Sequence, residues 1–198
     1  MRISRQVPFA AVVLLGALTS NAQVSSASSA GPPGTVPLSS LIATVAHKTD
    51  KVFIIDPRVN ANVAMIGEKP SSVTYDQLLT ILDTYGFAAV DTGGDIQIVP
   101  DPLVRMEPLP FVSGHQKFPN DEDVTAVLHV RSLPAGWLVP ILRPLVPRYG
   151  FLAAMPCSND LIIVERFANV RRIETVIRAM DTGKPIEPQS CAIAMPHR

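Results

Sequence analysis

The sequence of 198 residues predicts an α+β fold made of two small modules in tandem. Hydrophobic residues make up 47% of the chain and charged residues 17%, a composition that can build packed cores. The tripeptide Tyr-Gly-Phe occurs at residues 85–87 and 149–151, each time between a helical pattern and an aliphatic strand pattern. Glycine commonly ends helices, so the repeat reflects either that local preference or two related modules, and we favour related modules.

The N-terminus predicts export from the cytoplasm. Two arginines precede a short apolar run at residues 10–18, and small residues follow at Ser20 and Ala22. This is the layout of a secretory signal peptide at residues 1–22, with cleavage after Ala22. The apolar run is shorter than the roughly 20 residues that span a bilayer, although a retained N-terminal anchor stays open as an alternative. We therefore expect the mature protein in the periplasm.

The first module is expected at residues 36–102, after a flexible leader rich in serine, proline and glycine at residues 23–35. Helical spacing is found at residues 37–49 and 71–85, and β-rich runs are found at residues 51–56, 62–66, 87–90 and 96–99. Thr74 and Gln77 fit a capping box at the start of the second helix. A glycine-rich turn between the last two strands predicts a hairpin.

A linker at residues 103–123 leads to the second module at residues 124–181, and residues 182–198 form a tail that we expect to be disordered. The module's pattern predicts a strand at residues 124–130, a helix at 133–149, strands at 151–154 and 161–164, and a helix at 167–180. Pro140 and Pro144 predict that the first of these helices is kinked or broken, because an interior proline costs about 3 kcal/mol. The acidic run at residues 121–123 is interpreted as a solvated surface.

The sequence predicts no catalytic, metal or cofactor site. The histidines are not spaced as metal ligands on one helix or strand, and no zinc-protease, nucleophile-elbow or phosphate-loop motif is found. Lysine and arginine together number 17, as do aspartate and glutamate, so no strong field favours nucleic acid. We expect a protein that is not an enzyme and that binds neither a cofactor, a small-molecule substrate nor nucleic acid.

Cys157 and Cys191 are an even pair in a chain that we expect in an oxidising compartment. A disulfide between them would tie the tail to the second module. The alternative, that neither thiol is bridged, stays open.

Several segments, in order, resemble the N-terminal periplasmic domains of type II secretion secretins. Residues 53–60 resemble the F-x-I-D-P-R-V-x-G segment of the first domain, with the usual final glycine replaced. Residues 138–146 are close to the L-V-P-x-L-R-P-L run of the second domain, and residues 159–164 and 169–181 resemble its later strand and helix. The resemblance covers about residues 37–181.

This resemblance implies a fold for each module. The first would be a mixed-sheet domain, similar also to the signalling domain of TonB-dependent receptors, and the second a βαββα domain similar to KH folds. A secretin continues into further periplasmic domains and a membrane barrel, whereas this sequence ends after the second module.

The resemblance also implies a non-catalytic role in type II secretion, as a component or accessory at the outer-membrane secretion complex. The implied partners are an inner-membrane platform component or a full-length secretin, with weak self-association. Val52, Phe53, Ile54 and Ile55 form the candidate edge strand for a partner. Two alternatives remain: a signalling module like that of TonB-dependent receptors, and a non-functional remnant of a truncated secretin.

Overall fold

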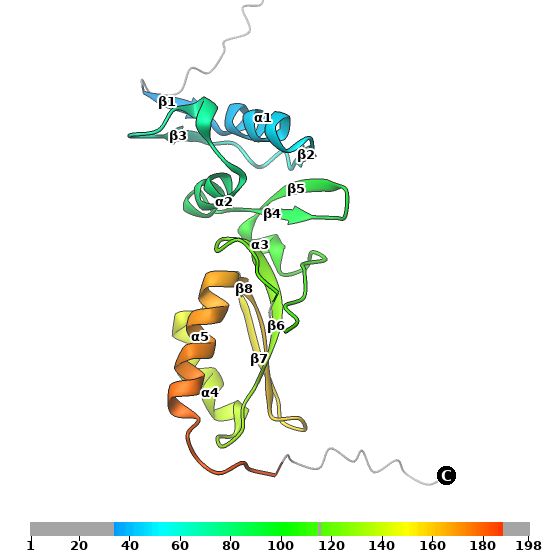
Figure 1. The fold of residues 1–198 in the computed structure, drawn as a ribbon, viewed down its shortest axis with the longest axis vertical. Helices are drawn as coiled ribbons and strands as arrows, with labels where there is room; N and C mark the ends of the chain where they lie inside the picture. The colour runs from blue at the N-terminus through cyan, green and yellow to red at the C-terminus, as the bar shows by residue number, and fades with distance from the viewer. Residues whose placement is uncertain (1–33, 115, 188–198) are drawn as a thin grey trace, which may run out of the picture. The chain divides into compact units, whose positions relative to one another are not determined.

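A computed structural model of the chain describes residues 34–114 and 116–187 (Figure 1). The predicted signal peptide with its cleavage after Ala22, most of the predicted leader, and Cys191 lie outside the described residues. The described elements gather around two large hydrophobic cores, one for each predicted module, in a mixed α+β architecture that confirms the predicted fold class.

The first module runs from the first described strand to a short helix after a hairpin. Its elements are β1 (Thr35–Pro37), α1 (Leu38–Thr49), β2 (Val52–Ile55), β3 (Asn62–Ala64), the 3₁₀ turn η1 (Pro70–Ser72), α2 (Tyr75–Thr84), β4 (Phe87–Asp91), β5 (Asp95–Pro100) and α3 (Asp101–Val104). β1 pairs antiparallel with β3. The other three strands form a mixed sheet in the order β2-β5-β4, in which β2 is parallel and β4 antiparallel to the central strand.

Local sequence signals explain how α2 begins and ends. The side chain of Thr74 accepts from the backbone N–H of Gln77 at 3.3 Å, and the Gln77 side chain accepts from the N–H of Thr74 at 2.8 Å. This reciprocal capping box satisfies two N–H groups that the helix leaves open, as predicted. Gly86, with φ of +79°, then turns the chain from α2 into β4.

The second module has the predicted element order βαββα. Its elements are β6 (Asp123–His129), α4 (Ala135–Leu142), the 3₁₀ turn η2 (Arg143–Leu145), β7 (Phe151–Met155), β8 (Asp160–Arg166) and α5 (Phe167–Met180). The strands form an antiparallel sheet in the order β6-β8-β7, and α4 and α5 lie on one face of it (Figure 1). The finer likeness to KH folds stays a prediction.

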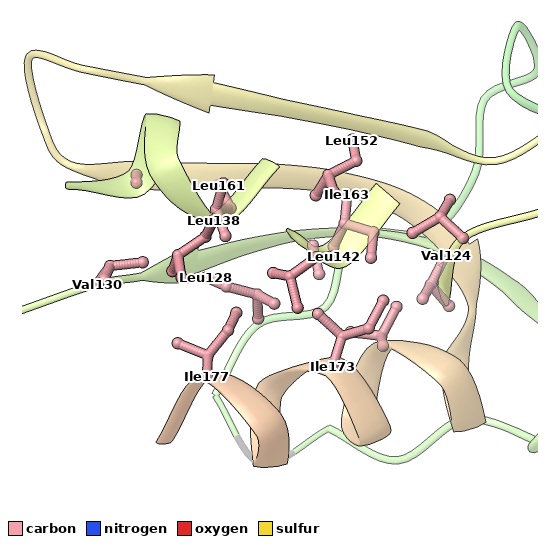
Figure 2. Close-up of a cluster of buried hydrophobic side chains, with 14 of the residues drawn as sticks. Val124, Leu128, Val130, Leu138, Leu142, Leu152, Leu161, Ile163, Ile173 and Ile177 are labelled. Carbon is pink, nitrogen blue, oxygen red and sulfur yellow. The ribbon is translucent and has the colours of Figure 1, made fainter. Parts of the chain in front are cut away.

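Apolar residues from all five elements fill the core of the second module (Figure 2). The labelled side chains Leu138 and Leu142 of α4, Ile173 and Ile177 of α5, and Ile163 of β8 are each at most 3% exposed. Burial of such side chains stabilises the fold by roughly 1.5–3 kcal/mol each. Both helices pack against one face of this sheet, and among the described residues no helix covers the opposite face.

The helix predicted at residues 133–149 is broken, as its two prolines indicate. α4 ends at Leu142, and the next turn is the 3₁₀ segment η2, which contains Pro144. Pro140 is accommodated inside α4. Loss of a backbone N–H at each proline prevents a continuous α-helical ladder.

The interpretation of the acidic run as a solvated surface is wrong. Asp123 is only 2% exposed, and Asp121 and Glu122 are partly buried. The backbone carbonyl of Glu122 accepts from the N–H of Phe167 at 2.9 Å, and Asp123 opens β6 opposite Arg166 in β8. Strand pairing draws the run into the protein, and a run of charges in the sequence cannot show that.

Gly150 lies where α4 and η2 meet the sheet. A Cβ atom there would lie 2.6 Å from Glu165 Oε2 and 2.7 Å from Val146 Cγ1, both in buried residues. We predict that Gly150→Ala destabilises the protein by about 1–3 kcal/mol through overpacking, measured by urea unfolding.

Gly136 provides the matched control, because it is exposed within α4 and a Cβ there meets nothing within 4 Å. Gly136→Ala is expected to stabilise by about 0.5–1 kcal/mol, since alanine favours the helix. Equal effects of the two substitutions would contradict the packing described for Gly150.

Candidate interaction sites

The predicted candidate strand at residues 52–55 is β2, and it lies at an edge of its sheet. The side chains of Val52 and Ile54 lie on its outer face and are 60% and 50% exposed, and Ile55 is 37% exposed. Phe53 points the other way and packs against the core of the first module. An exposed apolar edge strand is unusual in a protein that works alone, because such edges invite pairing with another chain.

Backbone alternation leaves part of this edge open. The N–H of Asp56 donates to the carbonyl of Ile98 in β5 at 3.0 Å, so even-numbered residues of β2 direct their backbone groups towards β5. The N–H and C=O groups of Phe53 and Ile55 therefore point away from the sheet. Within the described ranges, no residue hydrogen-bonds to them on that side.

The turn after β2 is held by its own charges. Arg58 donates from Nε and a terminal nitrogen to the two carboxylate oxygens of Asp56, at 2.9 and 2.7 Å, and its N–H bonds the same carboxylate at 2.8 Å. These bonds from Arg58 lower the pKa of Asp56 to about 2. The Asp-Pro-Arg residues of the secretin-like segment thus fix where β2 ends.

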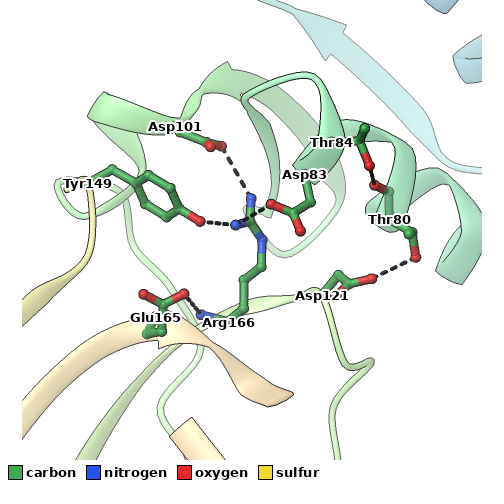
Figure 3. A network of polar contacts seen from close by, with 8 residues as sticks. All are labelled: Thr80, Asp83, Thr84, Asp101, Asp121, Tyr149, Glu165 and Arg166. Atoms are coloured by element: carbon green, nitrogen blue, oxygen red, sulfur yellow. Dashed lines mark hydrogen bonds and ion pairs between the residues drawn. The ribbon is translucent and has the colours of Figure 1, made fainter. Parts of the chain in front are cut away.

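A buried polar network lies between the two modules and is centred on Arg166, the last residue of β8 (Figure 3). Its guanidinium pairs with Asp83 of α2 at 2.5 Å and with Asp101 of α3 at 3.4 Å, and it also donates to the hydroxyl of Tyr149. The Tyr149 ring lies 5.1 Å from the guanidinium carbon, close enough for a cation–π contact. One side chain of the second module therefore binds two helices of the first.

Apolar and neutral contacts surround this network. Ala88, Val90, Val99 and Val104 of the first module form a small buried cluster against which Tyr149 packs. Thr80 of α2 donates to Asp121 at 2.6 Å (Figure 3). The junction thus excludes water around the Arg166 guanidinium, whose side chain is 9% exposed.

Carboxyl groups outnumber cations at this junction. Asp123 and Glu165 are each 2% exposed, and among the described residues Asp123 Oδ1 and Glu165 Oε2 have no hydrogen-bond partner. Burial raises the pKa of each of these carboxyls to about 7, although Arg166 partly opposes this for Asp123. Burial raises the pKa of Asp101 as well. The network therefore takes up protons near neutral pH.

We predict that the protein becomes more stable as the pH falls from 8 to 5.5. Asp123 and Glu165 hold protons more tightly in the folded state than in the unfolded chain, so their charged forms oppose folding above pH 7. The free energy of unfolding, measured in urea, should rise by at least about 1 kcal/mol over this interval, given about 1.4 kcal/mol for each pKa unit.

The double variant Asp123→Asn, Glu165→Gln should lose most of the rise in unfolding free energy that acidification from pH 8 to 5.5 produces. Glu68→Gln, at an exposed carboxyl, is the matched control and should retain it. A fold that loses stability on acidification over this range, or a double variant that keeps the full gain, would contradict the arrangement of the junction.

The structure places the tail close to the turn that carries Cys157. The N–H of Ile186 donates to the carbonyl of Arg131 at 2.8 Å, and Glu187 and Pro156 line one cavity of about 230 Å³. Cys191 follows four residues after Glu187, a span of at most roughly 14 Å when extended. The bridge between the two cysteines stays a prediction, because Cys191 lies outside the described residues.

We expect mass spectrometry of non-reduced, freshly purified periplasmic protein to find a Cys157–Cys191 cross-linked peptide. Cys191→Ser should then lower the unfolding free energy by up to about 3 kcal/mol, because the crosslink restricts the unfolded chain. Recovery of both cysteines as alkylated thiols would exclude the bridge.

The described histidines and carboxylates can also be compared with the geometry of metal sites. In the part of the chain that the structure describes, no group of three or more His, Cys, Asp or Glu side chains is arranged to hold a metal. His129 instead pairs with Asp160 at 2.8 Å across neighbouring strands. Among the described residues, no helix is long and apolar enough to cross a membrane.

Comparison with known proteins identifies both modules. Residues 35–98 match the model of the GspD-like N0 domain. Over 142 residues the chain is 39% identical to the secretin XcpQ of Pseudomonas aeruginosa, which covers 71% of this chain and 21% of XcpQ. The modules are N-terminal domains of the type II secretion secretin family. The predicted resemblance is thereby confirmed.

Other secretins are also similar to this chain over most of its length. Secretin GspD 2 of Escherichia coli is 31% identical over 150 residues, covering 73% of this chain and 22% of its own length. Among solved structures, one match is a chain in the outer-membrane complex of the Klebsiella pneumoniae type II secretion system, which contains PulD, PulS and the PulC HR domain. The TM-score is 0.63 and the sequence identity is 27%. The match covers 75% of this chain and 26% of that chain. The chain spans about a fifth of the length of these curated relatives.

The sequence did not reveal the Arg166 network of these secretin domains. In the sequence, Tyr149 is marked only by the repeated tripeptide, and no motif marks Asp83 or Asp101. The one feature that Tyr149, Asp83 and Asp101 share is that each lies at or near the end of a helix or strand. The packing of the two modules decides which of these helix and strand ends come into contact.

Proposed function

We propose that this chain is a non-catalytic component or accessory of a type II secretion machinery and acts in the periplasm through protein–protein contacts. The observation that carries the proposal is the 39% identity to a secretin across both modules. Secretin N-terminal domains are structural parts of protein-export complexes, so a contact role is the one that fits these modules.

The edge of β2 is the proposed docking site. The solved Klebsiella pneumoniae complex contains PulD together with PulS and the PulC HR domain, so a secretin meets other secretion proteins there. By analogy, we propose that an inner-membrane platform component or a full-length secretin adds a strand to β2. The open backbone groups of Phe53 and Ile55 would provide hydrogen bonds, and the exposed side chains of Val52 and Ile54 would provide apolar contacts.

The second module offers surfaces for weak self-association. Trp137 and Ile141 on α4 are 70% and 58% exposed. Val127, Phe151 and Met155 are each at least 42% exposed and alternate with core residues, so they lie on the sheet face away from the helices. Different apolar patches on opposite sides of one module suit head-to-tail contacts between copies. We expect a monomer or weak oligomer at micromolar concentration.

The proposal predicts that the chain without its signal peptide binds a platform or secretin periplasmic domain from its own secretion system. Ile54→Asp should weaken that binding at least tenfold in calorimetry, because a charge would be buried at the new strand pair. The melting temperature should change little, since the Ile54 side chain is already half exposed.

Ile141→Asp, at a similarly exposed apolar residue of the second module, is the matched control and should leave this affinity unchanged. If purified domains of the platform protein and the secretin both fail to bind, the proposed role is wrong. If Ile54→Asp binds as tightly as the parent chain, the docking site lies elsewhere.

A further inference from the structure

A groove runs beside the free edge of β6, on the side of the sheet that α5 covers. One hollow of about 470 Å³ is lined by Val127, Leu128 and His129 of β6 and by α5. It adjoins a second hollow of about 530 Å³, which shares Val127 and Leu128 and extends towards Phe118. β6 is an outer strand of its sheet, so this groove follows an exposed strand edge.

The chain already pairs one of its own segments with this edge. The N–H of Thr125 donates to the carbonyl of Pro110 at 2.9 Å, and the N–H of Val112 donates to the carbonyl of Thr125 at 2.8 Å. The linker thus forms a parallel bridge at Thr125. The edge of β6 is therefore geometrically able to accept an extended backbone.

Beyond Thr125 the same edge is open. Alternation directs the backbone groups of Val127 and His129 to the same side as those of Thr125, while Val130 bonds inward to Asn159 at 3.1 Å. No described residue hydrogen-bonds to the N–H or C=O of Val127 or His129 on the open side. Val127 and His129 are therefore two successive residues of β6, beyond the bridge at Thr125, whose outward backbone groups can pair with another strand.

The walls of the groove are mainly basic. Lys117, Arg131, Arg171 and Arg178 line the two hollows and are exposed. The carboxylates that line them, Glu174 and Asp181, already have partners: Glu174 pairs with Arg178 at 2.5 Å, and Asp181 accepts from the N–H groups of Arg131 and Ser132. Positive charge is left in excess along a groove whose floor includes the buried residue Ile177.

We infer that this groove binds an extended acidic segment of a partner protein, which adds to β6 as a further strand. Backbone hydrogen bonds to Val127 and His129 would fix the register. Side chains on one face of the added strand would meet Arg171 and Arg178 on α5, which suits carboxylates. Side chains on the other face would extend the apolar sheet surface at Val127. This site lies on the second module and does not depend on the proposed docking at β2.

The test uses the chain without its signal peptide and a fluorescent eight-residue peptide of alternating glutamate and valine. We expect a micromolar dissociation constant by fluorescence anisotropy, with NMR shift changes at the amides of Val127 and His129. The same peptide with N-methyl groups on alternate residues should bind at least tenfold more weakly, because it keeps its charge and lacks the backbone N–H groups that donate to β6. A lysine–valine peptide should not bind.

Arg171→Glu combined with Arg178→Glu should weaken binding at least tenfold, whereas Arg105→Glu, at an exposed arginine directly after α3, should change it less than twofold. Val127→Pro removes the open N–H at an edge position where proline is tolerated, and should have a similar effect to the double reversal. Should that variant fail to fold, the N-methylated peptide tests the same hydrogen bonds.

The inference is overturned if the glutamate peptide does not bind at millimolar concentration, or if the N-methylated peptide binds equally well. It is also overturned if the shifts map to β2, or if a second copy of the chain fills the groove and excludes the peptide. Ile54→Asp should leave peptide binding intact, so failure at this groove is distinguishable from failure at β2.

Discussion

The junction between the modules depends on one buried guanidinium. Arg166 is 7% exposed and joins α2 and α3 of the first module to the end of β8 in the second. A buried charge without partners costs several kcal/mol, and removing one member of a buried pair typically costs 3–5 kcal/mol. Arg166 therefore favours the charged form of Asp123, whose burial follows from the pairing of β6 with β8.

Much of the fold follows from local sequence signals. The capping box at Thr74 and Gln77, the hairpin after Gly86 and the prolines that break α4 each act within a few residues, so their outcome could be predicted. The burial of Asp123 could not be predicted, because it follows from the pairing of β6 with β8, which are distant in sequence. Charge patterns predict exposure only where no partner arrives from elsewhere in the chain.

The candidate sites also depend partly on local sequence and partly on strand pairing that the sequence does not show. The sequence of β2 predicts a strand, yet its place at an edge is set by the parallel pairing with β5. The sequence does not predict the open edge of β6, because the segment is apolar and its pattern is typical of a buried strand. What leaves it open is that the described residues of the linker pair with β6 at Thr125 and not at Val127 or His129.

The buried start of β6 has a mechanical consequence. Asp123 is both the first residue of this strand and one of the carboxyls facing Arg166, so the linker enters the second module through a desolvated charge cluster. Separating the modules would expose that cluster to water together with the apolar residues against which Tyr149 packs. Polar and apolar contacts therefore both oppose separation of the two modules.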